Sequence, residues 1–260
     1  MALGPGGARE EDVELRSPDR PPSIHAVCLD IDDTVVDFTA AARNALSALV
    51  GRDDMWTQWQ RITDEHVGLV VAGEMDYQTM RRARTKAFLA DMGALLDDDL
   101  VATLEDRRLT AMCSDWRPFG DALPCLEWLR AAKLKVAAVT NGSGAHQHTK
   151  LADVGLAEYF DEVIIAGELG ASKPDPMIFE TACVRLGVRS DQTVHVGDRL
   201  EVDAVGARDA GMHGIWLARE GCDDQPVPRG VHAIHSLAEL PELLVSEFVT
   251  PAVSVPEQRG

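Results

Sequence analysis

From about residue 117 onward, short runs of β-branched residues alternate with patterns typical of amphipathic helices. The runs that we expect to be strands are KVAAVT (135–140), EVIIAG (162–167), TVHVG (193–197) and GIWLA (214–218), and AVCL (26–29) adds a fifth near the N-terminus. Strands separated by helices pair in parallel, with the helices packed on both faces of the sheet. The sequence therefore predicts an α/β fold, in which ligands bind at the carboxyl ends of the strands.

The segment before this alternation has helical patterns and little strand character. An apolar stripe begins at Phe38, and further helices are expected near 54–71, 76–92 and 98–112. We therefore predict a Rossmann-like core with a parallel sheet and an inserted all-α domain. We expect the core to comprise residues 23–36 and 117–246, and the inserted helical domain to comprise residues 37–116. Residues 1–22 and 247–260 are expected to be flexible tails.

Composition and charge exclude several classes of partner. The formal net charge of −18 argues against a protein that binds nucleic acid or an anionic membrane. The five cysteines are scattered without CxxC spacing, which indicates neither a disulfide framework nor a zinc site. With no apolar run of 18 residues and no signal-peptide pattern, we expect a cytoplasmic protein. No pattern indicates the oligomeric state.

Polar clusters stand where the predicted strands end. Taken singly, such residues are most often turns, N-caps or a solvated lysine. The pair Asp30 and Asp32 is more informative, because carboxylates that follow a buried strand repel one another unless they share a cation or a proton. The clusters are Asp30-Ile31-Asp32-Asp33-Thr34, Thr140-Asn141-Gly142, Lys173-Pro174, and Gly197-Asp198 followed by Asp203.

In this order the clusters resemble the four motifs of the haloacid dehalogenase (HAD) superfamily of phosphotransferases. The matches are Asp30, Asp32 and Thr34 to the first motif, DxDx(T/V), Thr140 to the second, Lys173 in SKPDPMIF to the third, and Gly197, Asp198 and Asp203 to the fourth. The resemblance spans roughly residues 24 to 220. The chain is similar to the branch that contains N-acylneuraminate-9-phosphatases and nucleoside 5'-monophosphate phosphatases. In that branch a helical cap follows the first motif, and residues 37–116 would be that cap.

This resemblance implies a role for each matching residue. Asp30 would be the nucleophile and Asp32 the general acid and base. Mg²⁺, which takes oxygen ligands and keeps several waters, would be held by the side chains of Asp30 and Asp198 and the main-chain carbonyl of Asp32, with Asp203 in support. Phosphate would be bound by Lys173, Thr140 and the amide groups of Asn141 and Gly142. Asp33 stands where many members of the family have Gly.

We therefore expect a Mg²⁺-dependent phosphatase for a small phosphomonoester of the sugar phosphate or nucleotide class. A phosphomutase or another phosphotransferase would retain the same residues. A dehalogenase lacks the second Asp, because displacement of halide needs no proton donor, so Asp32 favours phosphoester chemistry. A silent regulatory or interaction domain would be expected to lose the nucleophile, the lysine or a metal carboxylate, and none is missing here. Substrate selection is expected to lie in residues 37–116.

Overall fold

The computed structural model describes residues 21–71, 73–142, 144–219 and 225–251. Within them lies a parallel sheet in the order β3-β2-β1-β4-β5-β6, which confirms the predicted fold class. Since β1 lies between β2 and β4, the three strands that carry the predicted site are neighbours. The strands are β1 (Ala26–Leu29), β2 (Lys135–Thr140), β3 (Glu162–Ile165), β4 (Thr193–Gly197), β5 (His213–Leu217) and β6 (Val231–Ile234).

The sheet differs from the prediction at one edge and in the bounds of two strands, of which β5 begins and ends one residue earlier than the predicted 214–218. The edge strand β6 was not predicted, because its four residues include a histidine and two half-buried positions, so that no apolar run marks it. The predicted strand 162–167 ends at Ile165, since Ala166 already begins the short helix α7 (Ala166–Leu169). None of these differences moves β1, β2 or β4.

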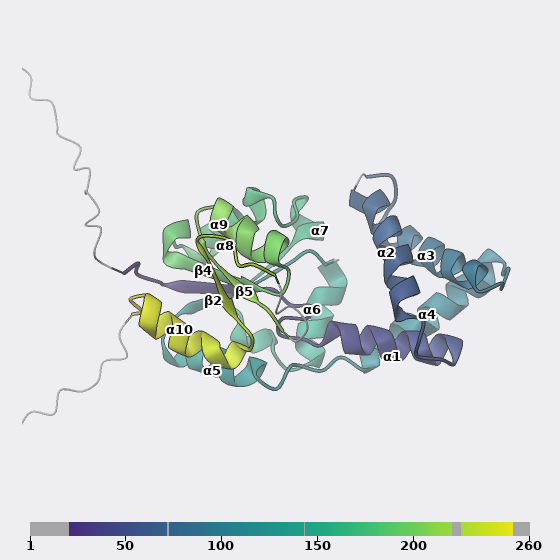
Figure 1. Cartoon of the computed structure of the whole chain (residues 1–260), viewed down its shortest axis with the longest axis horizontal. Helices are drawn as coiled ribbons and strands as arrows, with labels where there is room; N and C mark the ends of the chain where they lie inside the picture. The colour runs from purple at the N-terminus through teal and green to yellow at the C-terminus, as the bar shows by residue number, and fades with distance from the viewer. Residues whose placement is uncertain (1–20, 72, 143, 220–224, 252–260) are drawn as a thin grey trace, which may run out of the picture.

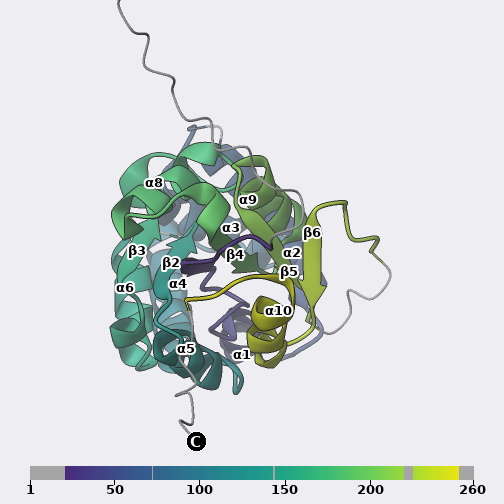
Figure 2. The same ribbon diagram turned by 90° about the vertical axis from the view of Figure 1, so that its left-hand side faces the viewer.

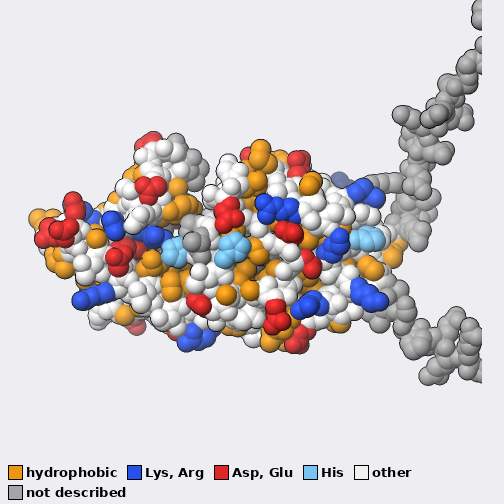
Figure 3. Space-filling model, turned by 180° about the vertical axis from the view of Figure 1, so that it is seen from behind, with side chains coloured by type: hydrophobic (Ala, Val, Ile, Leu, Met, Phe, Trp, Pro, Cys, Tyr) orange, Lys and Arg blue, Asp and Glu red, His pale blue; other side chains and the backbone are white. Residues whose placement is uncertain are grey.

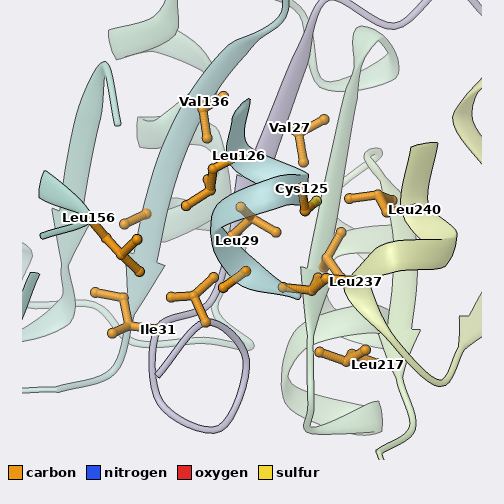
Figure 4. Packing of buried hydrophobic residues seen from close by; sticks show 14 of the residues in the cluster. Val27, Leu29, Ile31, Cys125, Leu126, Val136, Leu156, Leu217, Leu237 and Leu240 are labelled. Carbon is orange, nitrogen blue, oxygen red and sulfur yellow. The ribbon is translucent and has the colours of Figure 1, made fainter. Parts of the chain in front are cut away.

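Helices cover both faces of the sheet, which Figure 2 shows nearly end-on. Successive residues of β1 alternate between two hydrophobic clusters, with Val27 and Leu29 on one face and Ala26 and Cys28 on the other. The first face packs against α5 (Ala122–Ala131) and α10 (Leu240–Glu247), as Figure 4 shows at close range. The second packs against α8 (Pro176–Leu186) and α9 (Gly206–Asp209). The remaining core helices are α6 (Gly144–Asp153), 3₁₀ turns at Ala157–Tyr159, Ser190–Gln192 and Leu237–Glu239, and a π-helical turn at Leu200–Val205.

Four further helices form a module beyond the carboxyl ends of the strands (Figure 1). They are α1 (Phe38–Val50), α2 (Trp56–Val71), α3 (Tyr77–Asp91) and α4 (Asp98–Ser114), close to the ranges predicted from the sequence. The module has its own apolar cluster, and Glu105 forms buried ion pairs with Arg84 and Arg108. The two connections to the sheet run side by side, since Val36 and Pro118 form an antiparallel bridge.

The ordered chain continues past the end of α10. Phe248 is 6% exposed and its ring lies 5.0 Å from that of His213, centroid to centroid. Val249 pairs with Ser23 beside it. Most of the predicted tails, 1–22 and 247–260, lies outside the described residues. Within the second, Glu247 is the last residue of α10, and Phe248 escaped prediction because a single buried aromatic residue leaves no periodic pattern in the sequence.

The described surface shows no concentration of charge of one sign on the face drawn in Figure 3, where acidic and basic side chains are intermingled. No helix among the described residues is both long and apolar enough to cross a membrane. Within the same residues the cysteines at 28, 113, 125 and 183 are free, and Cys222 lies outside them.

The packing of α5 on the sheet gives a stability prediction. Leu126 is fully buried beneath β1. We expect Leu126→Ala to lower the free energy of unfolding by about 2–5 kcal/mol, because the substitution removes apolar contacts and leaves a cavity. Val184→Ala, on the 77% exposed side chain of α8, serves as the control and should change it by less than about 0.5 kcal/mol. Equal midpoints for the two variants in urea would contradict the packing described here.

Candidate active site

A cleft of about 280 Å³ opens at the carboxyl ends of β1, β2 and β4. Parallel pairing brings these ends to one edge, with Leu29 level with Ala138 and Val196. Every residue predicted for the site lies in the lining of this cleft. The lining is Asp30, Asp32, Asp33, Phe38, Thr140, Asn141, Gly142, Lys173, Asp198, Arg199, Val202 and Asp203.

Lys173 lies at the centre of the buried charges. Its Nζ donates to Asp30 Oδ1 at 2.5 Å and to the carbonyl oxygen of Val139 at 2.7 Å, and it lies 2.7 Å from Asp203 Oδ1. Burial would lower the pKa of the ammonium group, but Asp203 and Asp30 outweigh it and hold that pKa above its usual range. Lys173 therefore places a permanent positive charge beside Asp30 and Asp203.

Asp30, Asp198 and Asp203 gather opposite that charge, and one oxygen of each lies within 4.8 Å of the others. Burial, then the neighbouring carboxylates, raise the pKa of Asp30 to about 7 and that of Asp198 to about 8. The pKa of Asp203 is lowered instead, since Lys173 and His195 more than offset its burial. Three converging carboxylates with one lysine leave an excess of negative charge when all are ionised. This all-oxygen donor set fits a hard divalent cation such as Mg²⁺.

Asp203 is held from several sides. Its Oδ1 lies 3.1 Å from His195 Nε2, and its Oδ2 accepts from the amide of Arg199 at 3.0 Å. The π-helical turn Leu200–Val205 carries it back toward the end of β4. A Cβ atom at Gly197 would lie 2.3 Å from Asp203 Cγ, so only glycine leaves room for it. The sequence interpretation missed His195, although a histidine inside the buried strand TVHVG is a signal.

The loop after β2 joins Thr140 to the Lys173 segment. The Gly142 amide donates to Thr140 Oγ1 at 3.1 Å. The side chain of Asn141 donates to the carbonyl oxygen of Lys173 at 2.9 Å and accepts from its amide at 2.7 Å. The side chain of Asn141 therefore holds the lysine segment in place, which the sequence interpretation did not foresee.

Asp33 has a different task from the two preceding carboxylates. Its Oδ1 accepts from the Thr39 amide at 2.8 Å and its Oδ2 from Thr39 Oγ1 at 2.7 Å, which ties it to the first turn of α1. Its φ of 60° lies in the left-handed region, which glycine adopts freely and Asp tolerates better than most residues. This backbone conformation explains why Gly and Asp both suit this position.

Asp32 points to α6. Gln147 Nε2 donates to Asp32 Oδ2 at 3.0 Å, and Lys150 Nζ forms an ion pair with Asp32 Oδ1. Neither partner was predicted. The available signal was their spacing of three residues on a helix that directly follows the Thr140 loop.

Helix α3 brings the helical module to the site. The Tyr77 hydroxyl donates to the carbonyl oxygen of Asn141 at 3.4 Å, and Arg81 Nη1 lies 3.3 Å from His146 Nε2. Burial, with Arg81 and Lys150 nearby, lowers the pKa of His146. The first turns of α3 therefore lie next to the phosphate-binding loop predicted from the sequence.

Comparison with known proteins places the chain among hydrolases. The model of the haloacid dehalogenase-like hydrolase family matches residues 24–211. A glyceraldehyde 3-phosphate phosphatase of Methanopyrus kandleri is 31% identical over 208 residues, which cover 75% of this chain and 84% of that protein. The human N-acylneuraminate-9-phosphatase is 36% identical over 118 residues, which cover 44% of this chain and 47% of that protein.

Solved structures show the same architecture. The HAD-hydrolase YfnB from Bacillus subtilis, solved with bound magnesium, superposes with a TM-score of 0.71 at 25% identity and covers 86% of this chain and 99% of that one. A 2-haloacid dehalogenase from Pseudomonas syringae superposes with a TM-score of 0.62 at 30% identity and covers 85% and 98%. The relatives by sequence thus include phosphatases and the similar structures include a dehalogenase, and the choice between these two activities depends on the residues of the cleft.

Proposed function

Because the chain belongs to the haloacid dehalogenase-like hydrolase family, we propose that it is a Mg²⁺-dependent phosphatase that hydrolyses a small phosphomonoester through an aspartyl-phosphate. The observation that carries the proposal is the convergence of Asp30, Asp198 and Asp203 around Lys173 at one end of the sheet. Two of the relatives are phosphatases by name, for glyceraldehyde 3-phosphate and for N-acylneuraminate 9-phosphate. We place the substrate in the sugar phosphate or nucleotide class.

Asp30 is the proposed nucleophile. Its carboxylate oxygen bonds to phosphorus while the bond from phosphorus to the ester oxygen breaks. Lys173 stays charged beside it and offsets the repulsion between the carboxylate and an anionic phosphoryl group. Asp30 and Asp198, with the main-chain carbonyl of Asp32 and with Asp203 in support, would hold Mg²⁺, which supplies further neutralisation of phosphoryl charge when bound.

Asp32 is the proposed general acid and base. As an acid it gives its proton to the ester oxygen that leaves phosphorus, so that an alcohol and not an alkoxide is released. It then takes a proton from the water whose oxygen bonds to phosphorus, which restores protonated Asp32. The bond between phosphorus and the Asp30 oxygen breaks in the same step, which releases phosphate and restores the Asp30 carboxylate. Displacement of halide needs no such donor, so Asp32 in the cleft favours a phosphatase over a dehalogenase.

The helical module of residues 37–116 is the proposed cap. Its position beyond the strand ends (Figure 1) and the contact of Tyr77 with Asn141 support this assignment. A cap over the cleft excludes water and contacts the leaving group. We therefore assign substrate selection to this module.

A substrate panel tests the proposal. Purified protein with Mg²⁺ is offered sugar phosphates, nucleoside monophosphates, glyceraldehyde 3-phosphate and 2-chloropropionate, and free phosphate and chloride are measured. We expect phosphate release from at least one ester and no chloride release. Conversion to an isomeric phosphate would instead indicate a phosphomutase. No reaction across the panel would favour a silent regulatory domain.

Replacement of Thr140 is expected to reduce kcat without abolishing activity. Its side chain is 1% exposed and lies at the end of β2, in the lining of the cleft. Thr140→Val keeps the shape but removes a hydroxyl that would donate to the phosphoryl group. We expect kcat to fall on the order of 10²-fold, as for the loss of one donor to a transition state. Thr181→Val, at a half-buried position of α8 outside the lining of the cleft, is the matched control and should leave kcat unchanged. Equal rates for both variants would exclude Thr140 from phosphate binding.

A further inference from the structure

Two side chains of α6 hold the carboxylate of Asp32. Gln147 Nε2 donates to Oδ2 at 3.0 Å, and Lys150 Nζ pairs with Oδ1. The two residues are three positions apart, so they lie on the same side of the helix. Because each oxygen has its own donor, the orientation of the carboxylate is fixed as well as its location.

Both donors are themselves immobilised by burial. Gln147 is 3% exposed and Lys150 is 2% exposed, whereas the side chain of Asp32 remains 28% exposed toward the cleft. Lys150 Nζ also lies 4.9 Å from the ring centroid of Phe38 and 5.3 Å from that of Trp116. Such contacts between an ammonium group and aromatic faces are favourable. The cation therefore has little freedom to leave Asp32.

The glycine at 142 makes room for this arrangement. A Cβ atom there would lie 1.8 Å from Gln147 Nε2 and 2.6 Å from its Cδ. Gln147 thus passes directly against the loop that we assign to phosphate binding and reaches Asp32 from it. The side chain of Gln147 therefore lies between this loop and Asp32.

We propose that Gln147 and Lys150 are positioning residues that hold Asp32 in the orientation in which it protonates the leaving oxygen. This inference rests on the phosphatase function proposed above. An ionised carboxylate has about four lone-pair sites, so two donors from α6 leave a site for the proton that Asp32 transfers. Proton transfer requires the two heavy atoms to come within about 2.6–3.2 Å. A carboxylate free to rotate would meet that condition less often, and the cost would fall on protonation of the leaving group.

The test compares two esters that differ in their need for a proton. The leaving group of 4-nitrophenyl phosphate is a stabilised anion, whereas that of phenyl phosphate is more basic and gains more from a general acid. We expect Lys150→Met and Gln147→Leu each to lower kcat on phenyl phosphate at least about tenfold more than on 4-nitrophenyl phosphate, because general acid catalysis contributes roughly 10²–10⁴-fold where a proton is needed. Gln147→Leu introduces no buried charge defect and serves if Lys150→Met folds poorly, as judged by circular dichroism.

A double-mutant cycle and a matched control complete the experiment. In an Asp32→Asn background, Lys150→Met should have no further effect on either ester, since the lysine acts through Asp32. Lys135→Met removes an exposed lysine at the first residue of β2, at the opposite end of that strand from Thr140, and should leave both rates unchanged.

The outcomes separate this inference from the function on which it rests. Equal losses on the two esters, or an undiminished effect of Lys150→Met in the Asp32→Asn background, would overturn the positioning role and leave the phosphatase intact. A wild-type protein that releases phosphate from neither ester would overturn the proposed function itself.

Discussion

Replacement of Asp30 by Asn is expected to abolish phosphate release, with a fall in kcat of at least about 10⁴-fold, the order seen when an enzyme loses its nucleophile. Asn has nearly the same shape and can still accept from Lys173, but its amide oxygen cannot form the acyl phosphate. The buried site loses one of its converging carboxylates, so the fold should not be weakened.

The same variant has a second, chemical readout. Wild-type protein quenched in acid during turnover should carry one phosphoryl group on the peptide that contains Asp30, detected by mass spectrometry, and Asp30→Asn should carry none. Asp209→Asn, which changes a carboxyl group on the surface of α9, is the matched control and should retain full activity. Turnover by Asp30→Asn close to the wild-type rate would remove Asp30 from the mechanism.

Removal of divalent cations is expected to have an effect of similar size. Treatment with EDTA should abolish phosphate release, and added Mg²⁺ should restore it. The physical reason is the excess of carboxylates over cations among the buried groups of the cleft. Asp198→Asn should raise the Mg²⁺ concentration needed for half-maximal activity, whereas Asp209→Asn should not. Full activity of EDTA-treated protein would contradict the metal assignment.

Stability gives an independent readout of the same site. The pKa of Asp30 is raised to about 7 and that of Asp198 to about 8, so these two groups bind more protons in the cation-free folded state than in the unfolded state between roughly pH 4 and 8. These two groups therefore lower the free energy of unfolding as the pH rises through that window. Mg²⁺ binds their ionised forms and should reverse the loss. We expect the increase in Tm caused by Mg²⁺ to be larger at pH 8 than at pH 5.5, as measured by differential scanning fluorimetry.

Much of the fold could be predicted because the signals were local. Helix α8 begins after Asp175, which accepts from the Met177 amide at 2.9 Å, and ends before Gly187, which has a φ of 64°. Asp is a preferred residue at the start of a helix and Gly at its end. Strands β1, β2 and β4 were predicted from apolar runs, and all their residues except Lys135 are buried. The strand β6 and the buried Phe248 escaped prediction, because neither forms a periodic pattern and both depend on neighbours distant in the chain.

The sequence by itself determined the order of the motifs and the parallel sheet. It therefore also determined that the polar clusters meet at the carboxyl ends of the strands. Only the tertiary structure decided which partner each of the neighbouring carboxylates has. Asp30 accepts from Lys173, Asp33 from Thr39 of α1, and Asp32 from Gln147 of α6. The contacts of Asp32 join residues 115 and 118 positions apart. Periodicity reports which side of its own element a residue occupies, whereas such contacts arise only when separate elements pack together.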